Sequence, residues 1–592
     1  MTRGSLAASV VSLVVLLMSG TANATPTWLA PQDISAEGAK AESPQVALDA
    51  AGNAVAVWQH WVGDNRVIGT AFRPAGAGWQ RDQDLSDAGA DAQHPQIDVN
   101  PAGDAVAVWY QSVGSSYSVI EAAVRPAGGR WAGPEELSGG GVNATVPQVA
   151  LDQNGNALAV WERLGPTPVV QASIRAGGAW SAPQNLSSPG QDAEFPQVAF
   201  GPNGNAAAVW QSFNGSNFVA QSAVRSSDGG RWGAPQDLSA PGKDAKNPQV
   251  AMDGAGNALA VWERFDGANW IIQAAGRPPE GTWSSPEDLS APGQDAHEPE
   301  VAVDGYGNAW AIWSRSNGAH DVIQAAERPF GRGWGAAEDL SAAGHSADVP
   351  LLVLDPVGDA IAVWRRSDDG SNGIAQAALR PANGNWGAIR DLSDAGEVAF
   401  DPDVAVDAAG NGLAAWMRFR GGVDEVIQAA GLDAAGPVFD NLLVPRRGVV
   451  GRRLTFSVRS FDVWSPLAEA PHWTFGDGTS ADGWRVQHAY AFGPASFPVE
   501  VSESDAVGNQ TSFAGEDVSV APAPCVVPRV VGLTLAKAKA AIRKRHCRPG
   551  RVARAFSGTV RTGRVVAQHP KARKRLPSGA RVDLVVSRGR RP

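Results

Sequence analysis

The sequence predicts a mainly β protein, in which an eight-bladed β-propeller is followed by two smaller modules. Three observations lead to this prediction. The 592 residues exceed what one hydrophobic core supports. The composition combines 43% hydrophobic residues and 22 Trp with 68 Gly and 41 Pro, which is typical of many short strands joined by turns. A unit of about fifty residues also recurs along most of the chain.

Residues 1–24 have the pattern of an export signal. Arg3 precedes an apolar run from Leu6 to Leu17, and Ala22-Asn23-Ala24 is a small-x-small cleavage site. We therefore expect a mature chain that begins at Thr25 and an extracellular protein. The apolar run is shorter than the roughly 20 residues that cross a bilayer, and no later stretch qualifies, so no transmembrane anchor is expected.

Two series of tryptophans define the repeat, and sixteen of the 22 Trp belong to them. Both series run through eight copies with the same seven intervals of 49 to 52 residues. The first series is Trp58, Trp109, Trp161, Trp210, Trp262, Trp313, Trp364 and Trp416, and the second is Trp28, Trp79, Trp131, Trp180, Trp232, Trp283, Trp334 and Trp386.

Each unit contains four strand-like pieces, as one propeller blade requires. Between the second and third pieces, turns such as Asp49-Ala50-Ala51-Gly52-Asn53 predict a hairpin with a positive φ at Gly52. The run from Ala54 to Trp58 is apolar on both faces, as expected for a strand packed between neighbouring sheets. We assign residues 25–435 to the propeller, and the pattern leaves open which piece forms each outer strand.

Residue types that recur in every unit are expected to serve folding, so candidate functional residues are those that break the repeat. The loop between the third and fourth pieces varies most, and it carries additional aromatic side chains beside Asn and Asp. Aromatic faces beside amides and carboxylates are suited to sugars. The alternative is plain packing, since loops often place an aromatic side chain on the strand beneath them. The candidate ligand-binding residues are Trp61, Tyr117, Phe213, Phe218, Phe265 and Trp270.

Residues 436–521 contain Trp473-Thr474-Phe475-Gly476-Asp477-Gly478-Thr479, then His488-Ala489-Tyr490, then Asp505-Ala506-Val507-Gly508-Asn509. This segment resembles a PKD domain, which implies a small Ig-like β-sandwich. The resemblance also implies that Asp477 and His488 have structural roles. Alternation of apolar and polar residues between glycine turns is consistent with a sandwich. We expect this module to be a spacer.

Residues 525–592 differ sharply in charge from the rest of the chain. They hold 19 Lys and Arg against one acid, Asp583, whereas residues 1–524 carry a net charge of −29. The segment from Cys525-Val526-Val527-Pro528 through an Ala/Lys/Arg run to Leu576-Pro577-Ser578-Gly579 resembles a PASTA domain. This resemblance implies one helix against a three-stranded sheet, and an association with bacterial envelopes and peptidoglycan fragments.

The two cysteines, Cys525 and Cys547, match a pair found in some secreted PASTA modules, so the resemblance implies a disulfide. Further ligands for a metal site are lacking beside them, and no metal and no cofactor are expected.

The basic module is expected to attract anionic polymers with a steep dependence on salt. Candidate partners are peptidoglycan or an anionic wall polymer, while glycans or surface proteins are candidates for the propeller, and no intracellular nucleic acid is expected. A solvated basic tail without a partner is the alternative. The candidate envelope-binding residues are Arg543, Lys544, Arg545, Lys571, Arg573, Lys574 and Arg575.

The propeller carries Tyr110, Tyr117 and Tyr306, none of them in a recognisable catalytic motif, and no phosphate loop, zinc-protease motif or nucleophile elbow. We therefore expect a non-catalytic binding or adhesion protein of the cell surface or wall, held there by its basic module. The alternative is a secreted glycosidase or lyase whose site lies over the central opening, and a third interpretation is a protein–protein platform.

Overall fold

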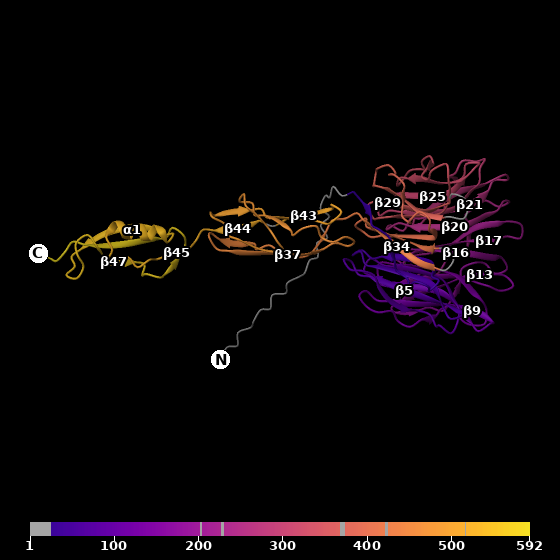
Figure 1. Ribbon diagram of the computed structural model, residues 1–592, viewed down its shortest axis with the longest axis horizontal. Coiled ribbons are helices and arrows are strands. Elements are labelled where there is room, and N and C mark those ends of the chain that lie inside the picture. Colours follow the sequence, from indigo (N-terminus) through magenta and orange to yellow (C-terminus); the bar gives the residue numbers. More distant parts are fainter. Residues whose placement is uncertain are drawn as a thin grey trace. The chain divides into compact units, whose positions relative to one another are not determined.

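The computed structural model describes residues 25–591 except 202–203, 227–229, 368–372, 421–423 and 516, so the predicted export signal lies outside the described residues. The chain divides into two compact units (Figure 1). The ring unit comprises Ala24–Ala435 and Asp462–Pro466, and the C-terminal unit contains Gly436–Phe461 and Leu467–Pro592. No helix among the described residues has the length and apolar character needed to span a membrane.

Strands β1–β34 form eight antiparallel sheets, and the predicted mainly β class is confirmed. Each sheet is a meander whose strands follow one another in sequence, apart from the last sheet. The first strands are β3 (Glu42–Leu48), β7 (Ala92–Val99), β11 (Ala144–Leu151), β16 (Asp192–Phe200), β20 (Ala245–Met252), β24 (Ala296–Val303), β28 (Ser346–Leu354) and β32 (Val398–Val406). The second strands are β4 (Ala54–Val62), β8 (Ala105–Val113), β12 (Ala157–Arg163), β17 (Ala206–Phe213), β21 (Ala258–Phe265), β25 (Ala309–Ser316), β29 (Ala360–Ser367) and β33 (Gly412–Arg420).

The third and outer strands complete the sheets. The third strands are β5 (Asn65–Arg73), β9 (Tyr117–Arg125), β13 (Val169–Ala176), β18 (Phe218–Arg225), β22 (Trp270–Arg277), β26 (Asp321–Arg328), β30 (Gly373–Arg380) and β34 (Asp424–Asp433). The outer strands are β6 (Gln80–Asp84), β10 (Glu135–Glu136), β14 (Ala179–Trp180) with β15 (Gln184–Asn185), β19 (Gln236–Asp237), β23 (Glu287–Asp288), β27 (Glu338–Asp339), β31 (Arg390–Asp391), and β1 (Thr27–Trp28) with β2 (Gln32–Asp33).

The first strands of successive sheets contact one another, and β3 contacts both β7 and β32, so the row of sheets closes into a ring. The start of the chain completes the last sheet, because β1 and β2 pair with β34 through Trp28↔Leu432 and Gln32↔Ala429. The piece that begins each repeat is therefore an outer strand, which answers the question that the sequence left open. Closure also removes the free sheet edges that an open row would leave.

The core of the ring unit lies between neighbouring sheets. In β4, Ala54, Ala56 and Trp58 pack against the last sheet, whereas Val55 and Val57 pack against the second sheet. The strand is thus buried on both faces, as its sequence predicts. Trp58 is 2% exposed and its seven counterparts are fully buried, so the first Trp series supplies the largest apolar side chains of this core.

The turns between first and second strands also match the sequence prediction. Gly52 has φ +80°, and Asp49 Oδ1 accepts hydrogen bonds from Ala51 N and Asn53 N. A side chain at position 52 would be strained in this conformation, which explains why glycine recurs there. The turn closes the hairpin of β3 and β4.

The C-terminal unit contains short strands around a core that includes Phe456, Trp473, Phe475 and Tyr490. Three small sheets enclose this core, and their orders are β35-β37-β40, β36-β44-β41 and β39-β38-β42-β43. The strands are β35 (Val438–Leu443), β36 (Arg447–Val449), β37 (Leu454–Phe461), β38 (His472–Thr474), β39 (Ser480–Asp482), β40 (Arg485–His488), β41 (Ala495–Phe497), β42 (Glu500–Ser504), β43 (Gln510–Ala514) and β44 (Val518–Ala521).

Asp477 and His488 are paired within this core region. His488 Nε2 lies 2.8 Å from Asp477 Oδ2, and Asp477 Oδ1 accepts a hydrogen bond of 2.6 Å from Thr479 Oγ1. Burial opposes the charge of Asp477, but the hydrogen bonds from Thr479 and His488 outweigh burial and lower the pKa of Asp477. Both side chains make contacts that serve the fold.

The last part of the chain combines the helix α1 (Leu535–Lys544) with two small sheets, β45-β48 and β46-β49-β47. Thr534 caps the helix by accepting from Lys537 N, while Ala538 and Ile542, four residues apart, are buried on one face. Arg543 and Lys544 occupy the last turn, where cations favour the helix dipole. The strands are β45 (Cys525–Val526), β46 (Arg548–Ala555), β47 (Val565–His569), β48 (Arg575–Leu576) and β49 (Arg581–Ser587).

Candidate ligand-binding surfaces

One end of the ring unit gathers the variable segments of the repeat. In an antiparallel meander, the start of the first strand and the turn between the second and third strands lie at the same end of the sheet. We call this end of the eight sheets the hairpin face. The six candidate aromatic residues lie within these hairpins, on β4, β9, β17, β18, β21 and β22, and all are partly buried.

The structure brings four of the six aromatic residues together in pairs. Phe213 and Phe218 face each other across one hairpin with ring centroids 5.3 Å apart, and Phe265 and Trp270 do the same across the next at 5.6 Å. Trp61 instead lies under the guanidinium of Arg66, in the first sheet. Tyr117 belongs to the second sheet, so the six residues do not form one site.

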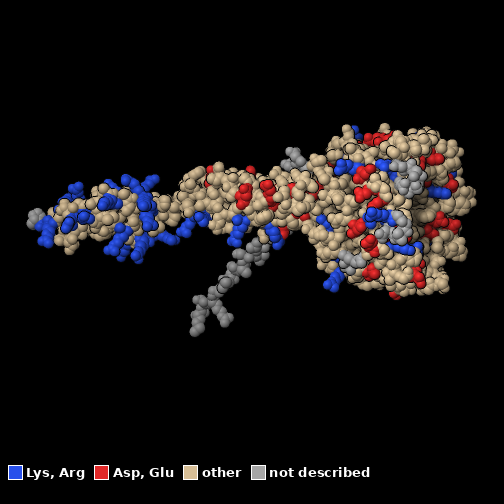
Figure 2. All heavy atoms as spheres, viewed as in Figure 1, with Lys and Arg blue, Asp and Glu red and all other residues tan. Residues whose placement is uncertain are grey.

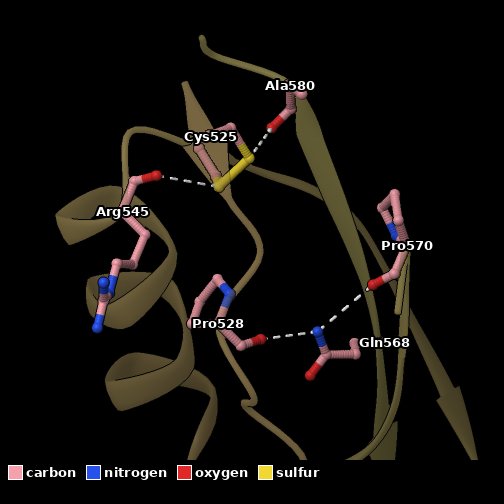
Figure 3. Close-up of a disulfide and its surroundings, with 7 residues drawn as sticks. Cys525, Pro528, Arg545, Gln568, Pro570 and Ala580 are labelled. Carbon is pink, nitrogen blue, oxygen red and sulfur yellow. Dashed lines mark hydrogen bonds between the residues drawn. A yellow bond between two sulfur atoms is a disulfide. The ribbon is translucent and has the colours of Figure 1, made fainter. Parts of the chain in front are cut away.

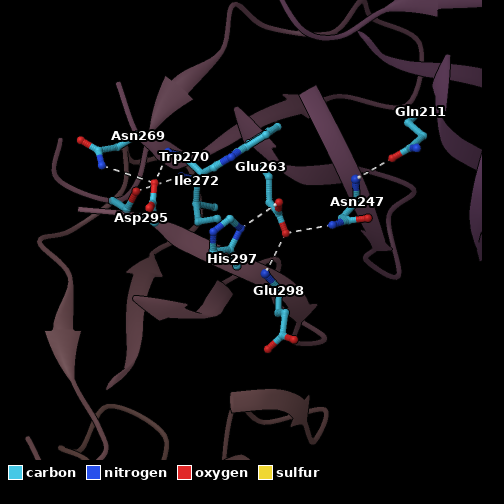
Figure 4. Close-up of polar contacts among 10 residues, drawn as sticks. Gln211, Asn247, Glu263, Asn269, Trp270, Ile272, Asp295, His297 and Glu298 are labelled. Carbon is cyan, nitrogen blue, oxygen red and sulfur yellow. Dashed lines mark hydrogen bonds and ion pairs between the residues drawn. The ribbon is translucent and has the colours of Figure 1, made fainter. Parts of the chain in front are cut away.

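Beside the second aromatic pair, Glu263 organises a set of polar groups (Figure 4). Its carboxylate lies 3.1 Å from His297 Nδ1 and accepts hydrogen bonds from Asn247 Nδ2 at 2.9 Å and from the backbone N of Glu298 at 3.0 Å. The hydrogen bond that Glu263 accepts from His297 raises the pKa of His297. Burial opposes the charge of Glu263, but its hydrogen bonds outweigh burial, and its pKa is lowered.

A β-bulge that the repeat pattern did not predict lies near the start of every first strand. The residue before the repeated proline adopts a positive φ of 47° to 55° in all eight strands, and the register shifts there. Because a bulge redirects side chains, these residues point differently from the ladder around them. They differ in every repeat except for two valines: Ser43, His94, Val146, Phe195, Asn247, Glu298, Val349 and Asp401.

Side chains of neighbouring sheets hold some of these bulges. The backbone N of His94 donates to Gln59 Oε1 at 3.1 Å, and that of Asn247 donates to Gln211 Oε1 at 3.3 Å. Gln59 and Gln211 each follow a repeated tryptophan. The sequence does show two variable positions before each repeated proline. It does not show that the backbone bulges there and redirects these side chains.

Two acids depart from the glutamine that recurs in the first strands. Glu300 accepts a hydrogen bond of 2.8 Å from Gln249, and burial, followed by the charges of Asp403 and Glu298, raises its pKa to about 8. Burial likewise raises the pKa of Asp403 to about 7, although Asp403 accepts a hydrogen bond of 2.6 Å from the backbone of Val46. Both carboxyl groups therefore hold protons more tightly than ordinary acids do.

The first sheet also departs from the repeat, in the residue that stands opposite its buried tryptophan. In six sheets the indole N–H donates to a glutamine of the third strand at 3.0 to 3.3 Å, as in Trp313 to Gln324. In the first sheet, Gly69 stands opposite Trp58, and His60 Nε2 lies 3.0 Å from Asp84 Oδ1. A cavity of about 300 Å³ occurs there, and these four residues line it together with Ala39, Thr70 and Gln83.

The candidate envelope-binding residues are all exposed. Two basic segments that are distant in sequence meet at β45, because the backbone N of Val526 donates to Arg545 O and that of Val527 donates to Lys574 O. We call these segments, 543–545 and 571–575, the basic surface. Figure 2 shows Lys and Arg crowding the visible face of the region that carries α1 and β47. No ion pair occurs within residues 525–591, the described part of this region.

The predicted disulfide between Cys525 and Cys547 is confirmed (Figure 3). It links β45 to the end of α1, and both cysteines are buried. Nearby, Gln568 Nε2 donates to Pro528 O at 2.8 Å and Gln568 Oε1 accepts from Val530 N at 2.8 Å. The disulfide and this glutamine fix the segment that joins the two halves of the basic surface.

Residues 526–588 match the family model of the PASTA domain. We refer to them as the PASTA module. The match confirms that part of the sequence prediction, and the predicted helix against a three-stranded sheet is present in this module.

A probable serine/threonine-protein kinase of Clostridium acetobutylicum is 34% identical to this chain over 73 residues. The match spans 12% of this chain and 11% of the kinase. The chain thus covers about a tenth of the length of this curated relative.

Several solved structures are similar to this chain at low sequence identity. A lectin from Burkholderia pseudomallei is 12% identical, with a TM-score of 0.40, over 60% of this chain and 100% of the lectin. An ulvan lyase is 11% identical, with a TM-score of 0.41, over 60% and 96%. The β-propeller domain of the Trilobed protease from Pyrococcus furiosus is 7% identical, with a TM-score of 0.36, over 60% and 98%.

Proposed function

We propose that this protein is an exported binding protein of the cell surface or wall. In this proposal, the ring unit is an eight-bladed β-propeller whose hairpin face binds a ligand. Residues 436–521 form a PKD-like spacer, and the PASTA module tethers the protein to peptidoglycan or an anionic wall polymer.

The main support for the tethering role of the PASTA module is the basic surface. It joins two cationic segments through backbone hydrogen bonds from two consecutive residues, Val526 and Val527, so the fold holds their charges at fixed positions. The only acid of residues 525–592, Asp583, accepts a hydrogen bond from the backbone of Arg551. A polyanion would therefore meet these cations without displacing an existing ion pair, and its counterions would be released on binding.

The hairpin face supports the ligand-binding role. Its bulges present a different side chain from almost every repeat on a scaffold that is otherwise uniform. In such a scaffold the repeated residues maintain the fold, so the side chains at the bulges can vary and serve recognition.

Sedimentation with purified cell walls tests the tether. The full chain is compared with a triple variant of the basic surface, Lys571→Gln, Lys574→Gln and Arg575→Gln, and with a control triple variant that removes the same charge elsewhere, Arg551→Gln, Arg554→Gln and Arg561→Gln. We expect the first variant to be released and the control to be largely retained. Binding of the full chain should be lost near 1 M salt, where the Debye length is about 3 Å. Absence of wall binding by the full chain, or equal losses in both variants, contradicts the local tether.

Glu300 and Asp403 favour a second candidate, a carbohydrate-active enzyme. Their pKa values of about 8 and about 7 would supply a protonated carboxyl group near neutral pH, as a general acid requires. Release of reducing ends or unsaturated sugars from wall polysaccharides by the full chain, with its loss in Glu300→Gln, would establish this function in place of the non-catalytic one.

A further inference from the structure

Three departures from the repeat coincide in the fourth and fifth sheets. Of the eight hairpins between second and third strands, only these two carry aromatic residues at both facing positions, as the pairs Phe213–Phe218 and Phe265–Trp270. The residue two positions before the repeated proline is Lys246 in the fifth sheet, and it is not lysine in any other sheet. The other repeats fold without the two aromatic pairs and without this lysine, so folding alone does not explain why they occur together.

Lys246 lies between the two aromatic pairs. Its Nζ is 4.9 Å from the ring centroid of Phe218 and 5.6 Å from that of Trp270. Trp270 in turn lies 6.1 Å from the ring of His297, measured between centroids. We call Lys246, Phe218, Trp270, His297 and Asn247 the Lys246 site, and Figure 4 shows its Asn247, Trp270 and His297.

Lys246 brings to the site a positive charge that no acid neutralises directly. Within the described residues, no carboxylate lies within ion-pair distance of Lys246. Glu263, which is opposite Lys246 in the ladder, is occupied by His297, Asn247 and the backbone of Glu298. The bond to Glu263 also raises the pKa of His297, so a charge on this imidazole beside Trp270 is paired with the Glu263 carboxylate.

Asn247 adds a polar group in a fixed position. It is exposed at the bulge with φ 48°, and its Nδ2 donates to Glu263. Its carbonyl oxygen is therefore turned from that bond, with no hydrogen bond found for it in the described part of the chain. An amide oxygen held in this way can accept a hydrogen bond from a hydroxyl group.

We propose that the Lys246 site binds an acidic saccharide. The faces of Phe218 and Trp270 would cover the C–H face of a sugar ring, the ammonium of Lys246 would pair with its carboxylate, and Asn247 would accept from a hydroxyl. A neutral sugar would leave the ammonium without its partner. This proposal depends on the ligand-binding role proposed for the hairpin face, and it names the ligand class and the residues.

Isothermal titration of the full chain tests the proposal with defined probes. The acidic probes are an oligogalacturonide, a hyaluronan oligosaccharide and 3′-sialyllactose, and each is paired with its carboxyl-reduced, neutral counterpart. We expect at least one acidic probe to bind more tightly than its counterpart. Lys246→Ala should weaken that binding by about tenfold or more, which is the effect of losing one charge-assisted hydrogen bond. Trp270→Ala should weaken binding of both members of the pair.

Lys243→Ala is the matched control, because it removes the same charge three residues away, where no ring contact is found among the described residues. Its affinity should stay within about twofold of the parent. Equal binding of acidic and neutral probes, binding that survives Lys246→Ala, or tighter binding of an acidic peptide such as hexaglutamate would overturn the proposal. So would the absence of binding by all three acidic probes.

The wall-sedimentation experiment separates this outcome from failure of the proposed function. If Lys246→Ala lost the saccharide but still sedimented with walls, both proposals would stand. If the parent chain sedimented but bound no acidic probe, only the Lys246 site would be refuted. Circular dichroism and the melting temperature of each variant show whether the ring unit remains folded.

Discussion

Gln249 donates a hydrogen bond of 2.8 Å to Glu300 and so joins the first strands of the fifth and sixth sheets. Glutamine occupies the position of Glu300 in the first five sheets, as Gln45, Gln96, Gln148, Gln197 and Gln249. The acid therefore takes the place of a neutral amide in a partly buried position.

Glu300→Gln should make the ring unit less sensitive to pH. Burial raises the pKa of Glu300 from 4.5 to about 8, so between these values the folded protein binds the proton more tightly than the unfolded chain does. The stability from this group is complete below about pH 4.5 and is lost as the pH rises through about 8. We expect the variant to be more stable than the parent at pH 9 by on the order of 1 kcal/mol or more.

Denaturant unfolding at pH 5 and pH 9 measures this effect. Glu287→Gln, which alters an exposed acid of β23, is the control and should leave the pH dependence unchanged. A parent chain that gains stability from pH 5 to pH 9 relative to Glu300→Gln would show that the carboxylate is stabilised and contradict the prediction.

Gln324→Ala should destabilise the sixth sheet by about 1–3 kcal/mol, because it leaves the buried indole N–H of Trp313 without its acceptor. Urea unfolding measures the loss. Glu338→Ala on the exposed strand β27 should change stability by less than about 0.5 kcal/mol. Equal stabilities of the two variants would show that the indole hydrogen bond does not contribute to the free energy of unfolding.

A chain that begins at Ala36 lacks β1 and β2 and should lose the outer strands that complete the last sheet. Its last sheet would expose the edge of β34, where Leu29 N and Ile34 N now donate to Gly431 O and Ile427 O. We expect faster proteolysis within β34 and a lower melting temperature. A chain that begins at Thr27 retains both strands and should match the parent. Identical digestion of the two truncated chains would refute the stabilising role of β1 and β2.

Reduction of the disulfide should destabilise the PASTA module by about 3 kcal/mol, because Cys525 and Cys547 are 22 residues apart and their link restricts the unfolded chain. Hydrogen exchange of the α1 amides, measured with and without reductant, reports the loss. The double variant Cys525→Ala and Cys547→Ala should exchange rapidly in both conditions. Unchanged protection of α1 after reduction would be the contrary result.

The sequence predicted the strands, turns and packing of the ring unit because these depend on local periodicity and on residues that every repeat shares. Trp58 and Gly52 are examples, since their surroundings can be inferred from neighbours along the chain. The role of Lys246 could not be inferred in this way. Its position depends on a bulge at Asn247 and on aromatic rings from two different sheets, which only the folded backbone brings together.

The pairing of residues 27–33 with β34 has a consequence for biosynthesis. Asp33 and Gln428, which are hydrogen-bonded, are 395 residues apart, and at roughly 5–20 residues per second the ribosome needs roughly 20–80 s to make the chain between them. During that interval residues 27–33 have been made but β34, the strand with which they pair, has not. The final fold of the ring unit can therefore be reached only after translation has passed residue 433.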